Sequence, residues 1–313
     1  MCIRDSSNYL LTNAPARKMF TETNSASFRE GLSKMLDDLE RGEGRLDIAT
    51  NDPSAFTVGK DLGTTEGEVV FQNDLMQLIQ YHPRTPDQHS VPILFVPAWI
   101  NKFYILDLKA QNSLVKWLVD QGHTLFVVSW VNPDQSYAEI GMEDYVEEGY
   151  LAALEQVKEI TGEKRVNVVG YCIAGTTLAL TLSLLKQRGD KSVKSATFFT
   201  ALTDFSDQGE FQPFLTNDFV DGIEAEIGDK GILPSVVMAR TFSFLRAQDL
   251  VYGPAVRSYM MGETPPAFDL LYWNGDGANL PGRLALPYLR GLCQAHHHPG
   301  GGGRPRGARP PGP

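Results

Sequence analysis

Cysteine is scarce in this chain of 313 residues, and the three that occur are Cys2, Cys172 and Cys293. An odd, widely scattered set forms no disulfide framework, so we expect a reducing compartment, the cytoplasm. Long apolar runs are also missing. No stretch approaches the roughly 18 consecutive apolar residues of a membrane span, and no apolar leader follows the N-terminus. These absences argue against secretion and against a transmembrane segment.

Basic residues are outnumbered, with 28 Lys and Arg against 38 Asp and Glu, which gives a formal charge of -10. Because no basic face is available to collect phosphates, nucleic acid is not expected as the main partner. The apolar content of 42% is ordinary for a soluble globular protein. The length allows one large α/β domain with an appended segment. Separately, we expect neither a metal ion nor a cofactor.

The two ends differ from the rest of the chain in composition. Residues 1–6 have no relation to the residues after them, and we interpret them as a sequencing artefact. Residues 295–313 begin with histidines and continue as Gly, Pro and Arg without an anchoring apolar residue. This pattern is typical of a frameshift or of a disordered natural tail, so both ends are left out of the predicted fold.

The middle of the chain alternates between two hydrophobic patterns. Continuous apolar runs of strand length lie at 93–97, 124–130, 166–170 and 196–202. Helical spacing fills the intervals at 108–120, 145–160 and 176–187. Buried strands that alternate with helices predict a mostly parallel sheet with helices on both faces.

The remaining segments complete a predicted organisation in several parts. Residues 7–70 form an N-terminal region that includes an amphipathic helix around 28–39, and residues 71–204 form the α/β core. Residues 205–265 have a helical pattern rich in aromatic residues, without a buried strand, which favours a cap or lid inserted over the sheet. Residues 266–294 return to the core.

One segment carries a chemical signature: Gly170-Tyr171-Cys172-Ile173-Ala174-Gly175 joins a buried strand directly to a helix. This is the context of the nucleophile elbow of α/β-hydrolase-fold enzymes, in which small residues flank a nucleophile on a strained turn. Here the nucleophile is Cys172, and Ala174 takes the place of the last glycine. The alternative interpretation is a buried cysteine that packs as a small hydrophobe.

The elbow predicts how Cys172 would be activated. The helix N-terminus favours a thiolate, and the backbone N–H of Ile173 is placed to stabilise an oxyanion. A second donor is expected from the loop after the first strand, near Ala98–Ile100.

Other ionisable residues have simpler interpretations. We expect His123 to be structural and His82 and His89 to be exposed. Asp107 most simply caps a helix. Asp204 ends the fourth strand, where it could act as an acid or cap the following turn.

Several long motifs resemble the class I poly(3-hydroxyalkanoate) synthase family. They lie at 71–81, 97–108, 122–133, 170–176, 198–205 and 268–276, in the family's order. The resemblance extends from about Asn8 to Leu292. It implies an α/β-hydrolase fold with a helical cap, with Cys172 matching the family's cysteine. Ile100, Tyr104 and Asp107 are candidates for supporting the site.

The resemblance also implies an activity and partners. The family polymerises (R)-3-hydroxyacyl-CoA into a polyester and releases CoA, through a covalent acyl-cysteine and with no other cofactor. The expected partners are the acyl-CoA substrate (3-hydroxybutyryl-CoA), the growing polyester, the polymer granule surface in the cytoplasm and a second subunit in a homodimer. A thioesterase or depolymerase on the same fold and a non-catalytic granule-binding scaffold remain as alternatives.

The family's acid and histidine have no counterpart in this sequence. After Cys172 the histidines are His296, His297 and His298, all in the aberrant tail. We therefore interpret the chain as a C-terminally truncated synthase that turns over little, with an exposed edge to its sheet.

Overall fold

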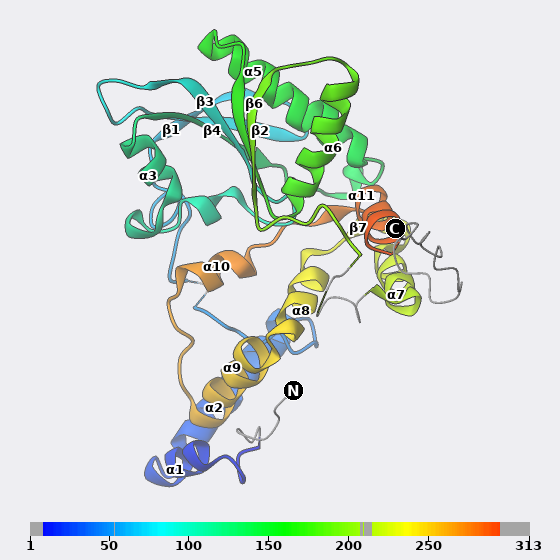
Figure 1. The fold of residues 1–313 in the computed structure, drawn as a ribbon. Coiled ribbons are helices and arrows are strands. Elements are labelled where there is room, and N and C mark those ends of the chain that lie inside the picture. The colour runs from blue at the N-terminus through cyan, green and yellow to red at the C-terminus, as the bar shows by residue number, and fades with distance from the viewer. Residues whose placement is uncertain (1–8, 53, 207–208, 210–214, 295–313) are drawn as a thin grey trace, which may run out of the picture.

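The computed structural model describes residues 9–52, 54–206, 209 and 215–294. The expected artefact at 1–6 and the tail at 295–313 lie outside these residues. A six-stranded sheet forms the centre of the molecule, in the order β1-β2-β4-β3-β5-β6 (Figure 1). Its strands are β1 (Gly67–Gln72), β2 (Met76–Tyr81), β3 (His89–Val96), β4 (His123–Trp130), β5 (Val166–Tyr171) and β6 (Val193–Phe199).

The sheet is parallel from β4 to β6 and antiparallel at its other edge. β3 pairs in parallel with β4 and β5, and β5 pairs in parallel with β6. β1 and β2 form an antiparallel pair, and β2 lies antiparallel to β4. The predicted mostly parallel sheet is thus confirmed, whereas the sequence pattern does not separate β2 from β1.

Helices cover both faces of this sheet. α3 (Leu114–Asp120) packs on one face through Val115 and Val119, against side chains such as Phe95 and Val127. α5 (Ala152–Thr161) and α6 (Ile173–Gln187) pack on the other, and the short α4 (Met142–Asp144) precedes α5. Successive residues of β3 and β4 belong alternately to the two clusters, as expected for strands buried on both faces.

Several predicted bounds shift. The α-helix expected at 108–120 begins only at Leu114. Two 3-10 turns, Phe103–Leu106 and Ala110–Asn112, come before it. The strand expected at 196–202 runs from Val193 to Phe199. The predicted strand extended too far because the residues after Phe199 are also apolar, although the chain leaves the sheet at Thr200, where φ is 42°.

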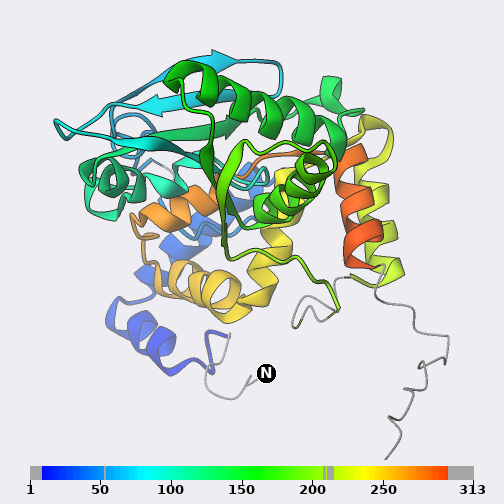
Figure 2. The ribbon, with the colours of Figure 1, turned by 45° about the horizontal axis from the view of Figure 1, so that its top comes forward.

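The N-terminal segment packs against residues 256–260 of the helical region after β6, away from most of the sheet. Elsewhere this helical region joins the core of the sheet, through Ile223, Ile227, Leu284 and Ala285. The helices of these two regions are α1 (Ala14–Glu22), α2 (Ala26–Arg41), α7 (Asn217–Ile227), α8 (Ser235–Leu245), α9 (Gly253–Ala255), α10 (Asp269–Gly275) and α11 (Gly282–Pro287). Figures 1 and 2 both show α2 alongside α9 and its neighbouring turns. A Cβ on Gly31 would lie 2.1 Å from the carbonyl oxygen of Tyr259, so these helices touch through backbone.

The predicted cap is helical in its described part, but a strand does interrupt it. β7 (Ile232–Leu233) is buried and pairs antiparallel with β8 (Leu280–Pro281). A two-residue strand has too short a pattern to be read from sequence. Residues 207–208 and 210–214 of the predicted cap lie outside the described residues. Within the described chain, no helix has the length and apolar character needed to cross a membrane.

Candidate active site at the turn between β5 and α6

Cys172 lies between the last residue of β5 and the first residue of α6. Its φ and ψ are 57° and -129°, a conformation that side chains other than glycine rarely adopt. The backbone N–H of Cys172 donates to the carbonyl oxygen of Phe199 at 2.8 Å, which ties the turn to β6. The structure therefore has the strained strand-to-helix turn that the sequence predicts, and α6 begins three residues earlier than expected.

Two glycines make this turn sterically possible. A Cβ on Gly170 would lie 2.8 Å from Cα of Gly175. A Cβ on Gly175 would lie 2.3 Å from Cβ of Ala201. Gly175, rather than the residue at Ala174, therefore supplies the close approach that the elbow pattern requires. Ala174 is fully buried, and its carbonyl oxygen accepts a hydrogen bond from the hydroxyl of Tyr150.

The electrostatics of the thiol differ from the expectation. Burial raises the pKa of the Cys172 thiol, and a hydrogen bond from the backbone N–H of Ile173 only partly offsets this. The expectation that the helix N-terminus would favour a thiolate is thus wrong in its net direction, because desolvation outweighs the helix. The Ile173 N–H lies at the Cys172 sulfur, and its role as an oxyanion donor stays a prediction.

The loop after β3 emerges beside this turn. Val96 pairs with Gly170 across the two parallel strands, so the loop at 97–101 and Cys172 leave the same end of the sheet. Trp130 Nε1 donates to the carbonyl oxygen of Pro97 at 2.8 Å, and Trp99 Nε1 donates to Thr177 Oγ1 at 3.3 Å. These bonds hold the predicted source of the second oxyanion donor against β4 and α6.

The three residues that were candidates for supporting the site have different partners in the structure. Ile100 is buried in this loop, and its carbonyl oxygen accepts from the N–H of Ala278 at 3.0 Å. The hydroxyl of Tyr104 instead donates to Asp276 Oδ2 at 2.8 Å.

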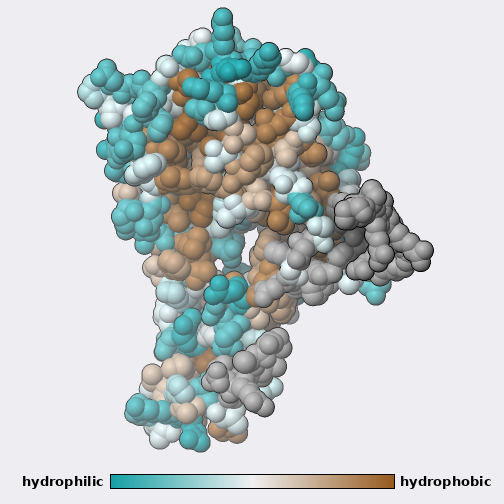
Figure 3. Space-filling view, in the orientation of Figure 1, coloured by the Kyte–Doolittle hydropathy of each residue, from teal (hydrophilic) through white to brown (hydrophobic). Residues whose placement is uncertain are grey.

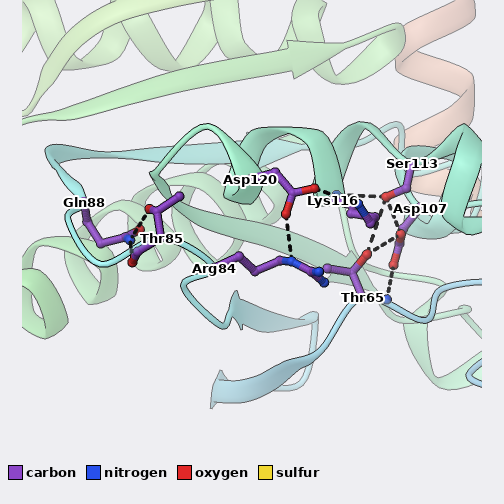
Figure 4. Close-up of polar contacts among 8 residues, drawn as sticks. All are labelled: Thr65, Arg84, Thr85, Gln88, Asp107, Ser113, Lys116 and Asp120. Atoms are coloured by element: carbon purple, nitrogen blue, oxygen red, sulfur yellow. Dashed lines mark hydrogen bonds and ion pairs between the residues drawn. The ribbon is translucent and has the colours of Figure 1, made fainter.

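Asp107 belongs to a separate polar network, shown in Figure 4. Its carboxylate accepts from the backbone N–H of Thr65 at 2.9 Å, and from the hydroxyls of Thr65 and Ser113 at 2.7 and 2.5 Å. Asp107 ends the 3-10 turn Phe103–Leu106, with its backbone N–H on the carbonyl oxygen of Tyr104. The interpretation of its side chain as the N-terminal cap of the following helix is wrong, because Ser113 caps α3 by accepting from the N–H of Lys116 at 2.8 Å. Asp107 fixes the capping serine and the loop before β1.

The histidines of the described chain lie away from Cys172. His89 and His123 begin β3 and β4, at the end of the sheet opposite the one where Cys172 lies. Their ring centroids are 4.7 Å apart, and burial together with His89 lowers the pKa of His123. His82 lies within 3.6 Å of Glu68 across β1 and β2. Asp204 accepts from the N–H of Ser206 at 2.9 Å, which matches the turn-capping alternative.

Tyr288 is a neighbour of the site that the sequence pattern does not indicate. Its ring packs edge-on against Trp99 at 5.8 Å between centroids. Burial raises its pKa, and Cys293 and Cys172 add to the shift. No local pattern links Tyr288 to the elbow, because residues 288–293 reach it only through the tertiary fold.

Comparison with known proteins agrees with the fold. A family model described as the alpha/beta hydrolase fold matches residues 91–290, and the chain belongs to this family. A second model, described as the N-terminus of poly-beta-hydroxybutyrate polymerase, matches residues 4–118. The predicted resemblance to poly(3-hydroxyalkanoate) synthases is thereby confirmed.

Two relatives give the resemblance its extent. The chain is 43% identical over 284 residues to the poly(3-hydroxyalkanoate) polymerase of Methylorubrum extorquens, covering 91% of this chain and 47% of that protein. It is 43% identical over 288 residues to the poly(3-hydroxyalkanoate) polymerase subunit PhaC of Cupriavidus necator, covering 90% and 48%. The chain thus spans about half the length of the curated relatives it matches.

Among solved structures, an alpha/beta hydrolase fold protein from Burkholderia ambifaria matches with a TM-score of 0.38 and 13% identity, over 73% of this chain and 77% of that one. The fold assignment rests on the family model and the sheet, and not on this low similarity.

Proposed function

We propose that the protein is an acyltransferase that polymerises (R)-3-hydroxyacyl-CoA, with 3-hydroxybutyryl-CoA as substrate, and releases CoA. The observation that carries the proposal is Cys172, a cysteine held at φ 57° on a strained turn between a buried strand and a helix. The similarity to poly(3-hydroxyalkanoate) polymerases supports the reaction and the substrate class.

The proposed reaction begins with the Cys172 sulfur attacking the thioester carbonyl. The negative charge on the carbonyl oxygen would be stabilised by the N–H of Ile173 and by a donor from the loop at 97–101. Collapse of this intermediate breaks the bond to the CoA sulfur, which leaves with the thiol proton. The hydroxyl of another hydroxyacyl unit then attacks the acyl-cysteine, forms an ester and returns the thiol.

The raised pKa of Cys172 makes a general base necessary for rapid turnover. Within the described chain, the histidines at 82, 89 and 123 lie away from the thiol, on or beside other strands. We therefore propose that this chain alone is acylated slowly and turns over little, because nucleophile and base act as a unit.

A surface of α2 supports attachment to a polymer granule in the cytoplasm. Phe28, Leu32 and Leu36 form one apolar stripe and are 36%, 44% and 57% exposed. The face of α2 that packs inward instead carries Ser27, Gly31 and Asp38. An outward apolar stripe fits an apolar polyester surface, and a second subunit in a homodimer is an alternative cover for it.

The test measures CoA release from (R)-3-hydroxybutyryl-CoA by thiol detection, together with polymer formation. We would compare this chain with a version extended by the C-terminal half of a relative. The proposal expects turnover and polymer only from the extended version, and loss of both in Cys172→Ala but not in Cys293→Ala. Hydrolysis to free 3-hydroxybutyrate without polymer would contradict the proposed acyl transfer.

A further inference from the structure

Two histidines lie side by side at the end of the sheet opposite Cys172. His89 begins β3 and His123 begins β4, and the two residues are register partners across these parallel strands. Their ring centroids are 4.7 Å apart, with the planes inclined by 33°. His89 is exposed and His123 is half-buried. The loop that leads into β3 lies at the upper left in Figures 1 and 3, where hydrophilic residues predominate on the surface. Small solutes can therefore reach the pair.

The residue before His89 carries an unsatisfied acceptor. Gln88 Oε1 is buried and has no hydrogen-bond partner, and no other buried side-chain nitrogen or oxygen of the described residues lacks one. Turning the amide around would not remove the defect. Gln88 Nε2 already donates to the carbonyl oxygens of Thr85 (Figure 4) and Asp87, at 2.7 and 3.1 Å. A buried oxygen without a partner costs free energy, so a bound group of positive charge would stabilise it.

The amide of Gln88 and the two histidines share one neighbourhood, around Gly122. A Cβ on Gly122 would lie 3.2 Å from the carbonyl oxygen of Asp87 and 4.0 Å from Cδ2 of His89. The same Asp87 oxygen accepts from Gln88 Nε2 at 3.1 Å. His123 follows Gly122 directly, and the N–H of His89 donates to the carbonyl oxygen of Gly122 at 2.8 Å. This turn therefore gathers two imidazoles and the amide that holds the unsatisfied oxygen.

The spacing of the rings fits two imidazoles that share one metal ion. An ion about 2.1 Å from one nitrogen of each ring lies about 3.2 Å from each ring centroid. With an angle of about 90–109° at the ion, the centroids are then about 4.5–5.2 Å apart. The observed separation of 4.7 Å falls within this range. Two imidazole nitrogens with an amide oxygen favour divalent transition-metal ions such as Zn²⁺, Ni²⁺ and Cu²⁺.

The number of ligands sets the strength of such a site. Within the described part of the chain, no group of three or more His, Cys, Asp or Glu side chains could hold a metal ion. The pair of imidazoles is therefore a smaller site than the four-ligand structural zinc sites of proteins, and water would complete the coordination. We expect reversible binding of an ion from solution.

We propose that His89 and His123, together with the amide oxygen of Gln88, form a surface site for a divalent transition-metal ion. The ion joins the start of β3 to the start of β4 and so holds the ends of two central strands together. The proposal does not depend on the proposed function, because the site lies at the opposite end of the sheet from Cys172. The ion takes no part in the acyl transfer.

The test measures binding of Ni²⁺ by isothermal titration calorimetry at neutral pH. The reference chain has glutamine in place of the consecutive histidines at 296–298, because such a run binds Ni²⁺ by itself. We expect His89→Gln and His123→Gln, each made in this reference chain, to weaken binding by about tenfold or more, because each removes one imidazole ligand. His82→Gln, at another exposed histidine, is the matched control and should bind as the reference chain does.

A second measurement uses the stability of the folded chain. An ion that binds the two strand ends of the folded protein should raise the midpoint of urea unfolding of the reference chain. The same concentration of Ni²⁺ should leave the midpoint of His89→Gln where it is without the ion. Gln88→Ala should weaken binding less than either histidine variant, because both imidazoles remain.

Three results would overturn the inference. The first is a reference chain that does not bind Ni²⁺, and the second is binding that His89→Gln leaves unchanged in a chain folded by circular dichroism. The third is equal weakening by His82→Gln, which would show a diffuse effect of surface histidines. If His123→Gln does not fold, His89→Gln decides the test, because its side chain is exposed.

Discussion

Replacing Cys172 by glycine is expected to cost less stability than replacing it by alanine, which reverses the usual order of the two residues. The reason is the backbone of the elbow, where φ is 57° and ψ is -129°. A residue with a Cβ held in such a sparsely populated region carries about 1–3 kcal/mol of strain. Alanine keeps this strain, and glycine removes it.

The opposing effect is smaller. Glycine has more freedom in the unfolded chain, which costs about 0.4–1 kcal/mol relative to alanine. Both substitutions lose the same thiol contacts, so the difference between them isolates the backbone. The two contributions leave Cys172→Gly more stable than Cys172→Ala by about 1 kcal/mol.

Urea unfolding, followed by circular dichroism, measures this difference. Ala179→Gly, within the regular part of α6, provides the control and should lose about 1 kcal/mol relative to the unaltered chain. If Cys172→Ala proves more stable than Cys172→Gly, the strained elbow is wrong, and with it the main structural argument for a nucleophile.

Three further predictions concern the same region. Burial raises the pKa of Cys172, so its rate of alkylation by iodoacetamide at pH 7 should fall below that of a free cysteine. The rate should keep rising with pH, and a rate that levels off below pH 8 would show a lowered pKa. Gly175→Ala should destabilise the fold by about 1–3 kcal/mol, because the new Cβ meets Ala201. Gly222→Ala in α7, where no atom lies within 4 Å of the new Cβ, should be neutral or stabilising in the same urea titration. Trp130→Phe should cost about 1–3 kcal/mol by leaving the Pro97 carbonyl without its donor, while Trp117→Phe, at a side chain 56% exposed, should change the unfolding midpoint little.

The elbow could be predicted from sequence because its signature is local. A buried strand, small residues and a helix follow one another within a few residues, and the steric need for Gly170 and Gly175 arises inside that segment. The same locality explains why the parallel core strands were placed within a few residues of their observed bounds.

Features that depend on residues far apart in the sequence could not be predicted from a local pattern. The sheet order places β4 between β2 and β3, which no local pattern specifies. The direction of the Cys172 pKa shift depends on the burial of the thiol by the tertiary fold, and the helix N-terminus alone gave the wrong sign. The inward packing of Ser27, Gly31 and Asp38 likewise comes from contacts between the N-terminal segment and residues 256–260.

The exposed edge of the sheet was predicted from the sequence, and the structure adds which side chains lie on it. β6 ends the described sheet and pairs with β5, and Phe198 and Phe199 on it are 41% and 40% exposed. An apolar edge strand invites pairing with another chain. We therefore expect this chain to associate in a concentration-dependent way in light scattering, and Phe198→Lys to reduce the association.

The most direct test of the central claim is to locate an acyl group on the protein. The chain would be incubated at alkaline pH, where more of the Cys172 thiol is ionised, with (R)-3-hydroxybutyryl-CoA, and its peptides analysed by mass spectrometry. We predict a hydroxybutyryl thioester on the peptide that contains Cys172, released by hydroxylamine and absent from Cys172→Ala. An acyl group found instead on Cys293, or none on Cys172 in a folded chain, would contradict the assignment of Cys172 as the nucleophile.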